Sequence, residues 1–419
     1  MSFEQALSGL NAASQNLDAI GNNVANASTI GFKEGRAEFA DVYAASIASQ
    51  TGTQIGIGTR LASVSPQFTQ GNITTTGNPM DVAINGNGFF RMSNGGVISY
   101  SRDGEFTLDK NGYIVNSVGD QLTGYPANAA GTISPSTPTA LQLSLGNIAP
   151  KATANASLSL NLDSRSTPPV AAFNLTDPTT YNSSTALTVY DSQGNSHTLS
   201  MYFVNTAANT WSVYAAGDGT GLNMSAGSAG PPVVPPAPQP IGTLSFNSSG
   251  VMAADVTMTP SMALTNGAAT PLKFSLLFPA ASASQYGTNF SVSSNTQDGY
   301  TTGQLSGFTI GQDGIVQGRY SNGQTRDQGQ IALANFVNSQ GLVALGGNQW
   351  AESSASGQPL IGAPSTGSLG ALQSGALESS NVDITTELVN MITAQRVYQA
   401  NAETIKTQDQ VEQTLMNLR

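Results

Sequence analysis

Residues 382–418, VDITTELVNMITAQRVYQANAETIKTQDQVEQTLMNL, form a stretch with helical apolar spacing that contains neither glycine nor proline. At a rise of 1.5 Å per residue, this predicts a helix about 55 Å long, which is longer than a compact domain usually holds. Ser380 together with Asp383, or Asn381, is expected to cap its start. A seven-residue recurrence begins at Leu377, and the expected contact residues are Ile384, Leu388, Met391, Ile392, Tyr398, Ile405, Val411, Leu415 and Leu418.

The other end of the chain carries a matching stripe over residues 1–30. Ala6, Ala13 and Ile20 alternate with a seven-residue series, and the expected contact residues are Phe3, Leu7, Leu10, Leu17, Ile20 and Val24. A stripe on a long, thin helix cannot bury itself, so it needs a partner helix from the same chain or from neighbouring copies. The C-terminal stripe runs for about ten turns and the N-terminal one for about six. If the two helices paired only with each other, part of the longer C-terminal stripe would stay uncovered. This favours packing between copies.

The sequence between the two stripes has the spacing of strands and turns. Asp81 to Phe90 places alternating apolar residues before an Asn85-Gly86 turn, which is typical of a β-hairpin. In the middle, Leu187–Tyr190, Met201–Val204 and Trp211–Tyr214 read as strands of a β-sandwich. The proline-rich run at 231–240 predicts an exposed loop, because proline lacks the backbone donor that a sheet requires.

These patterns predict a mixed α+β fold with a nested, discontinuous layout. Paired, coiled-coil-like terminal helices are expected from residues 1–30 with 381–419. Extended connectors are expected at 31–70 and 366–380, and an inner β-rich domain from 71–149 with 286–365. Residues 150–285 are expected to form an inserted outer domain of sandwich or barrel type. Chain termini that lie together at one end make such nesting easy.

Composition excludes several classes of function. Only 9% of the 419 residues are charged, the formal net charge is −11, and the 14 lysines and arginines form no basic run, which argues against nucleic-acid binding. There is no cysteine, so the chain can form neither a disulfide framework nor a thiolate metal site. Polar residues interrupt the first stripe, and Lys33 is the first basic residue. Neither a cleavable signal peptide nor a membrane-inserted span is therefore expected.

The motifs of common enzymes are missing from the sequence. His197 is the one histidine, which rules out clusters with several histidine ligands, and we expect it to be an exposed bystander. Gly56-Ile57-Gly58 and Gly86-Asn87-Gly88 each lack the third glycine of a dinucleotide fingerprint. No catalytic, cofactor or metal residues are therefore expected, although two carboxylates meeting in a cleft could still hydrolyse glycans.

Three segments, in order, resemble the signatures of bacterial flagellar rod and hook proteins. They are GNNVANASTIGFK at 21–33, DVAINGNGFF at 81–90, and SNVD at 380–383 continuing through QRVYQAN at 395–401. The resemblance covers roughly the first 120 and the last 40 residues of the chain. The motif residues that it assigns are Asn22, Asn23, Asn26, Gly31, Phe32, Lys33, Asn85, Gly86, Gly88, Phe89 and Phe90.

The resemblance implies a structural protein and not an enzyme. Hook members of this family carry a large insertion that distal rod members lack, so the insertion at 150–285 favours a hook subunit, with a distal rod subunit as the alternative. It further implies a curved tube of identical copies that transmits torque as a universal joint, with the helices inside.

The implied partners are the hook cap, the distal rod, the hook–filament junction proteins and the flagellar export apparatus. The implied location is the extracellular flagellum, reached by type III export without a cleaved signal. A less favoured reading is an exported β-rich, glycan-active enzyme.

Overall fold

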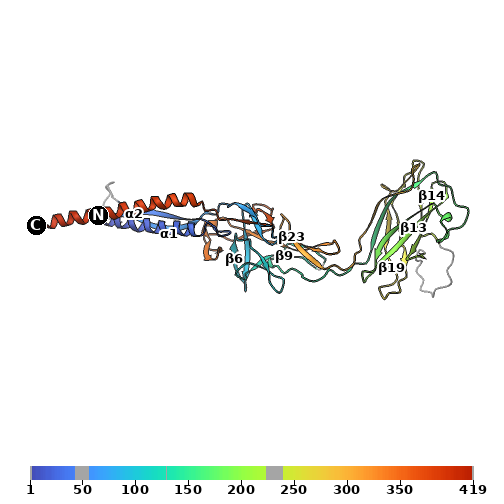
Figure 1. Cartoon of the computed structure of the whole chain (residues 1–419), viewed down its shortest axis with the longest axis horizontal. Coiled ribbons are helices and arrows are strands. Elements are labelled where there is room, and N and C mark those ends of the chain that lie inside the picture. The colour runs from blue at the N-terminus through green and yellow to red at the C-terminus, as the bar shows by residue number, and fades with distance from the viewer. Residues whose placement is uncertain (1, 43–55, 129, 223–238, 418–419) are drawn as a thin grey trace. The chain divides into compact units, whose positions relative to one another are not determined.

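A computed structural model describes residues 2–42, 56–128, 130–222 and 239–417, and the chain divides into two compact units (Figure 1). The first unit comprises Met1–Leu145, Ser306–Arg319 and Thr325–Arg419. The second comprises Gly146–Leu305 and Tyr320–Gln324, and we call it the outer unit. Strands dominate both units, and the described residues contain one α-helix near each terminus. This confirms the mixed fold class.

Both terminal helices form where the apolar stripes predicted them. Helix α1 spans Ser2–Ala25 and helix α2 spans Ile384–Asn417. Of the residues expected to cap α2, Asp383 does so, because its carboxylate accepts from the backbone N–H groups of Thr385 and Thr386 at 2.8 and 3.3 Å. Asn381 is engaged elsewhere, accepting from the Glu34 N–H and donating to the Gln67 carbonyl. Leu377, the first residue of the predicted stripe, lies instead in a short strand before the helix.

The two helices pack against each other in antiparallel orientation. Asn23 Nδ2 lies 3.4 Å from Glu387 Oε2, and a Cβ placed on Gly9 would come within 2.9 Å of the Asn401 side chain. The two contacts are separated by 14 residues on each helix, from 9 to 23 on α1 and from 387 to 401 on α2. One register therefore holds along the pair. Glycine at position 9 leaves room for the end of the Asn401 side chain, which an added Cβ would have to displace.

Residues 31–70 are not the extended connector that the sequence predicted. Strands β1 (Gly35–Val42) and β2 (Gly58–Pro66) pair antiparallel and pack on α1, with residues 43–55 between them outside the described range. The segment 366–380 likewise forms strands β30 (Ala371–Ser374) and β31 (Ala376–Glu378). They pair with β4 (Val82–Asn85) and β3 (Ile73–Thr75). The sequence did not predict these strands, because the segments are rich in glycine and threonine. In addition, β30 and β31 pair with strands that are distant in the sequence.

The inner β-structure is one large sheet of thirteen strands within the described chain, running β23-β24-β25-β9-β5-β6-β28-β27 with side branches. Its strands are β5 (Phe89–Asn94), β6 (Val97–Ser101), β7 (Thr107–Leu108), β8 (Ile114–Val115), β9 (Gln121–Pro126), β10 (Thr139–Ala140), β23 (Leu305–Ile310), β24 (Ile315–Tyr320), β25 (Thr325–Ile331), β26 (Leu333–Asn335), β27 (Val343–Gly346), β28 (Gln349–Ala351) and β29 (Leu360–Gly362). A short 3₁₀ turn spans Ser339–Gly341. The central strands of the large sheet are buried, because their apolar residues form two packed clusters.

Two details of the predicted inner domain are wrong. Asn85-Gly86 does not close a hairpin, since β4 pairs with β30 while β5 pairs with β6. Gly86 and Gly88 have positive φ angles of 109° and 124°, which lets the chain cross between these two sheets. Residues 286–305 were assigned to the inner domain, but β22 (Ser291–Gln297) pairs with β11 (Asn155–Asp163) and so belongs to the outer unit.

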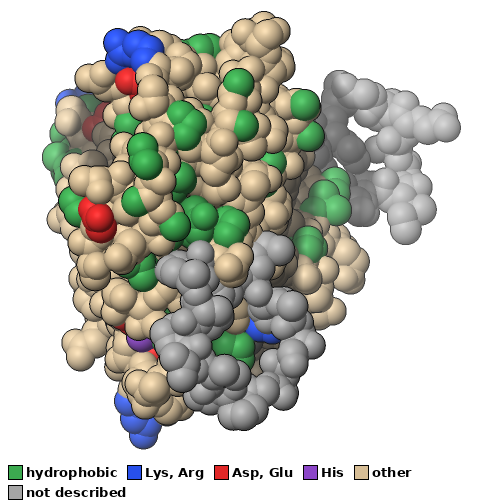
Figure 2. Space-filling view, turned by 90° about the vertical axis from the view of Figure 1, so that its right-hand side faces the viewer, with side chains coloured by type: hydrophobic (Ala, Val, Ile, Leu, Met, Phe, Trp, Pro, Cys, Tyr) green, Lys and Arg blue, Asp and Glu red, His purple; other side chains and the backbone are tan. Residues whose placement is uncertain are grey.

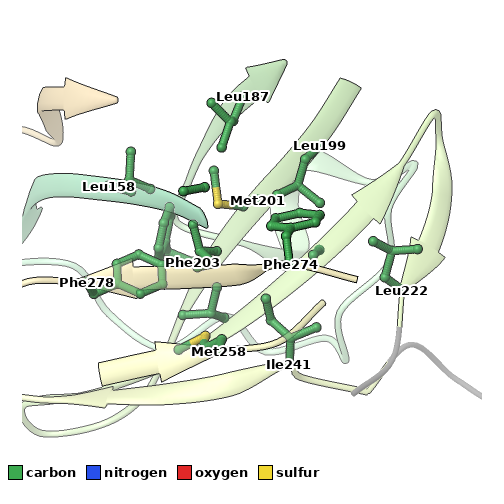
Figure 3. Close-up of a cluster of buried hydrophobic side chains, with 14 of the residues drawn as sticks. Leu158, Leu187, Leu199, Met201, Phe203, Leu222, Ile241, Met258, Phe274 and Phe278 are labelled. Atoms are coloured by element: carbon green, nitrogen blue, oxygen red, sulfur yellow. The ribbon is translucent and has the colours of Figure 1, made fainter. Parts of the chain in front are cut away.

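The outer unit consists of two five-stranded sheets around one apolar core (Figure 3). One sheet contains β17 (Val256–Met258), β20 (Ser275–Phe278), β11, β21 (Ser284–Tyr286) and β22. The other contains β12 (Ser183–Tyr190), β13 (Ser196–Ala207), β14 (Thr210–Gly217), β15 (Thr220–Leu222) and β16 (Gly242–Ser245). A small pair, β18 (Ser261–Met262) with β19 (Leu272–Lys273), and a 3₁₀ turn at Pro178–Thr180 complete it. The three predicted sandwich strands lie within β12, β13 and β14.

Two further expectations concern the outer unit. His197 is not an exposed bystander, because its ring lies between the carboxylates of Asp191 and Asp218 and its side chain is only 12% exposed. The proline-rich loop predicted at 231–240 falls largely on residues 223–238, which are outside the described residues.

A buried carboxylate joins the N-terminal and C-terminal parts of the first unit. Glu378, at the end of β31, accepts from Lys33 Nζ at 2.6 Å and from Arg102 Nη1 at 3.1 Å. The side chains of Lys33 and Glu378 are fully buried, and that of Arg102 is nearly so. The backbone N–H of Gly71 donates to the same carboxylate at 2.8 Å. Burial lowers the pKa of Lys33 and of Arg102, and attraction to Glu378 opposes that effect at both.

We expect Glu378→Gln to lower the free energy of unfolding of the first unit by about 3–5 kcal/mol, because two cations stay buried without their counter-charge. The chain has two tryptophans, and Trp350 lies in the first unit while Trp211 lies in the outer unit. Urea unfolding in a Trp211→Phe background, followed by Trp350 fluorescence, measures the change. Glu38→Gln, which neutralises an exposed carboxylate on β1, is the matched control. Equal stability of the two variants would contradict the importance of the Glu378 contacts.

The close approach of the helices gives a second prediction. Gly9→Val should displace the Asn401 side chain from α1 at a cost of about 1 kcal/mol, because the added side chain overfills the contact. Gly21→Val makes the same change where a Cβ meets nothing within 4 Å, and it should be tolerated. Hydrogen exchange of α1 amides should speed up only in the first variant, and Asn401→Ala should partly restore protection. Identical exchange in both valine variants would show that Gly9 is not required for packing.

Candidate assembly surface

Helix α2 leaves most of its apolar side chains uncovered. Of its predicted contact residues, Met391 and Ile405 are half-buried, while the exposed ones are Ile384, Leu388, Ile392, Tyr398, Val411 and Leu415. Leu388 is 45% exposed and Leu415 is 61% exposed. Leu418 lies outside the described residues. The side chains that α2 buries within the chain are those of Glu387 and Ala394. The apolar face of α2 therefore lacks most of the burial that its sequence predicts.

Helix α1 divides its stripe between two environments. The small residues Ala6 and Ala13, together with Ile20, are buried. The larger residues are less well covered: Phe3 and Leu7 are exposed, and Leu10, Leu17 and Val24 are half-buried. The structure thus brings the small side of the stripe against the rest of the chain, and it leaves the bulky side available.

Helix α2 also extends beyond its partner. The register of the pair places Ser2 level with Gln408, so the residues from Asp409 onward continue past the start of α1 (Figure 1). Every side chain described from Asp409 to Met416 is exposed, including Val411 and Leu415 on one face. We call residues 409–417 the overhang. Nine residues of helix correspond to roughly 13 Å of length without an intramolecular helix partner.

Two open grooves border the helices. One, of about 720 Å³, lies between α1, β2 and the β27–β28 hairpin, and residues such as Asn22, Val64 and Asn348 line it. The other, of about 740 Å³, lies between α1, α2 and β1, and residues such as Ala12, Phe39 and Val397 line it. Both linings are mostly apolar or uncharged. Such surfaces suit close contact with another uncharged surface, because few charges would need to be desolvated.

A pair of like charges lies where the helices meet β1. Burial raises the pKa of the Glu34 carboxyl, repulsion from Glu387 raises it further, and Arg36 opposes the shift. Asn23 bridges the same region, donating to the Gly35 carbonyl at 3.0 Å and accepting from the Gly35 N–H at 2.9 Å. These bonds fix the end of α1 to the start of β1.

The motif residues lie where α1 meets β1 and in the core of the first unit, and they do not form one surface. Gly31 donates its N–H to the Glu378 carbonyl at 2.8 Å, and its φ of 69° and contact with Asp103 exclude a side chain. The Gly86 carbonyl accepts from Arg102, which also lies over the Phe89 ring at 5.3 Å. The others are Asn22 in the last turn of α1, Asn26 bonded to it just after the helix, Phe32 and Lys33 beside them, Asn85 in β4, Gly88 in the crossing turn, and Phe90 in the core.

Sequence reasoning missed three residues that complete this junction. Arg102 and Glu378 are its buried charges, and Asn348 donates to the Ile30 carbonyl at 2.7 Å. The sequence carried no distinctive signal for them, since a glutamate that follows an apolar pair such as Ala376-Leu377 is usually exposed.

The described residues offer no cluster of three or more histidine, aspartate or glutamate side chains arranged to hold a metal ion. Neither helix in that part of the chain is long and apolar enough to cross a membrane. The arrangement that stands out in the described residues is the uncovered apolar face of α2.

Family models match four parts of the chain. Residues 3–33 match the flagella basal body rod protein model, and residues 83–158 match the flagellar hook protein FlgE/F/G D1 domain. Residues 161–300 match the flagellar basal body protein FlaE D2 domain, and residues 373–418 match the flagellar basal body rod FlgEFG protein C-terminal model. The D2 match falls on the outer unit.

Similar proteins span the whole chain. The flagellar hook protein FlgE of Salmonella typhimurium is 45% identical, and that of Escherichia coli is 46% identical, each over 100% of both chains. The Borreliella burgdorferi hook protein is 32% identical over 100% of this chain and 99% of its own. A crystal structure of Helicobacter pylori flagellar hook protein FlgE2 is similar in fold, with a TM-score of 0.50 at 15% identity, covering 73% of this chain and 100% of that one. Taken with the paired terminal helices and the inserted outer unit, these likenesses show that the chain belongs to the flagellar hook protein FlgE family.

Proposed function

We propose that this protein is the repeating subunit of the flagellar hook, and that copies assemble through the exposed apolar faces of α1 and α2. The observation that carries the proposal is the exposure of α2. An uncovered apolar face along a 34-residue helix is costly in water and is stabilised when another copy covers it. The contact residues are those predicted from the stripes, except Ile20, which is buried within the chain, and Leu418 lies beyond the described range.

The assembled form is a curved tube that acts as a universal joint and transmits torque from the rod to the filament. This role needs stiffness in twist, which interdigitated apolar side chains supply because they resist sliding. It also needs compliance in bending, which polar outer contacts supply because hydrogen bonds to uncharged groups exchange with water at small net cost. Figure 2 shows a face on which charged side chains are few and scattered, in keeping with the 9% charged composition.

The remaining partners follow from the same proposal. They are the hook cap, the distal rod, the hook–filament junction proteins and the flagellar export apparatus. The protein reaches the extracellular flagellum without a cleaved signal and has no enzymatic role. A distal rod subunit is the nearest alternative, and the outer unit argues against it, since this unit matches the D2 model and the hook relatives align along the full chain.

Leu388→Asp tests the assembly surface. Burying a new carboxylate between copies should cost about 3 kcal/mol or more, which raises the critical concentration for polymerisation about 100-fold. The single chain should fold normally, because Leu388 is already half exposed in it. Sedimentation and electron microscopy measure the polymer, and urea unfolding measures the chain.

Val170→Asp is the matched control, because it adds the same charge at a fully exposed position of the outer unit. It should assemble like the unmodified protein. Unchanged tubes from Leu388→Asp would refute the role of α2 in assembly, whereas straight tubes from the unmodified protein would favour the rod alternative.

A further inference from the structure

The one histidine of the chain lies between two carboxylates in the outer unit. His197 is near the start of β13, with Nδ1 2.6 Å from Asp218 Oδ2 and Nε2 3.3 Å from Asp191 Oδ2. A neutral imidazole has one N–H donor, whereas the protonated ring has two. The geometry at both nitrogens therefore fits the protonated ring.

Asp191 is the most firmly held residue of this cluster. It is fully buried, and its carboxylate accepts from the backbone N–H groups of Gln193 and Asn195 at 2.8 and 2.9 Å. It also accepts from the side-chain amides of Asn195 and Asn266 at 2.9 and 2.6 Å. One carboxylate thus organises the β12–β13 turn and ties it to the loop between β18 and β19.

Asp218 is the more weakly held partner. It follows β14 with a positive φ of 47°, and its side chain is about half exposed. Its carboxylate accepts from the Thr198 N–H at 2.9 Å as well as contacting His197. The histidine therefore links the β14–β15 turn to the buried Asp191, and through it to the β12–β13 turn and the Asn266 loop.

The cluster lies at the part of the outer unit where the chain enters and leaves it. A Cβ on Gly194, in the turn that Asp191 organises, would come within 2.7 Å of Pro150 and 3.2 Å of Thr301. Tyr190, just before the turn, exchanges hydrogen bonds with Thr153. The outer unit begins at Gly146, and its main segment ends at Leu305. The joined turns thus brace the base of this unit.

We propose that His197 is a pH-responsive latch at the base of the outer unit: the protonated ring holds the β14–β15 turn to the buried Asp191, and loss of the proton releases that turn. The latch is a property of the folded single chain, so it goes beyond the proposed assembly and can be tested without it.

The charged groups that face the ring set the pH range. Burial disfavours the charged ring, but hydrogen bonds and attraction from Asp218 and Asp191 outweigh that cost and raise the pKa of His197. Burial of the two carboxyls acts against their ionisation, and their hydrogen bonds overcome it and lower the pKa of both. The latch is therefore strongest between about pH 4 and 6.5, and it weakens as the pH rises through the raised imidazole pKa.

A single histidine allows a direct measurement. In the full chain before assembly, labelled with ¹³C-histidine, the one imidazole signal should titrate with a pKa above the ordinary 6.5. Asp218→Asn should bring that pKa back toward the ordinary value, because the nearer carboxylate is lost. An unmodified chain that titrates at or below 6.5 would overturn the proposal, and this needs no variant to fold.

Hydrogen exchange then tests the release. After correction for the intrinsic pH effect, the Thr198 amide should lose protection severalfold between pH 5.5 and 8.5, whereas the Val213 amide in the core of β14 should not. His197→Gln, which keeps a neutral donor, should remove this pH dependence. If Thr198 protection changes equally in the variant and the unmodified chain, His197 is not the latch.

Discussion

The buried carboxylate of Glu378 is the contact on which the first unit depends. It binds Lys33 and Arg102, so it brings the segment after α1, the segment after β6 and the segment before α2 to one point. The outer unit is inserted between these segments, and such an insertion requires the two halves of the first unit to close on each other. Apolar packing alone specifies such a closure loosely, whereas a buried charge must find its partner. This explains why residues at the ends of the chain meet with one register.

The two terminal helices use part of their surface to hold the first unit together, and they leave much of their apolar surface uncovered. Their polar and small residues are used inside the chain, as in the Asn23 bonds to Gly35 and the contact of Gly9 with Asn401. Most of their bulky apolar residues are left exposed or half-buried, and Ile20 is an exception. In the proposed assembly, this division would let one pair of helices serve two purposes, because the side that fixes the fold does not compete with the side that would bind other copies. The low charge of the chain supports the same division, since a dense tube tolerates few desolvated charges.

The sequence predicted what depends on local periodicity and missed what depends on distant pairing. Both helices and the central sandwich strands followed from spacing along the chain. The β1–β2 hairpin, the pairing of β4 with β30, and the membership of β22 in the outer unit did not, because their partners are remote or their residues are small and polar. The motif residues were found, but sequence could not show that Lys33 is buried on Glu378 or that His197 contacts two carboxylates. Both facts arise from turns that converge only in the folded chain.

The exposure of α2 also determines when that helix is stable. A helix owes most of its stability in water to packing, and α2 packs within the chain mainly through Glu387, Ala394 and the contacts near Asn401. The overhang has no helix partner at all in the described chain, so it is the part where opening costs least free energy. Contact with another copy would supply the missing burial and order the helix in the same step. In the proposed assembly, burial by another copy and the ordering of α2 therefore occur in the same step.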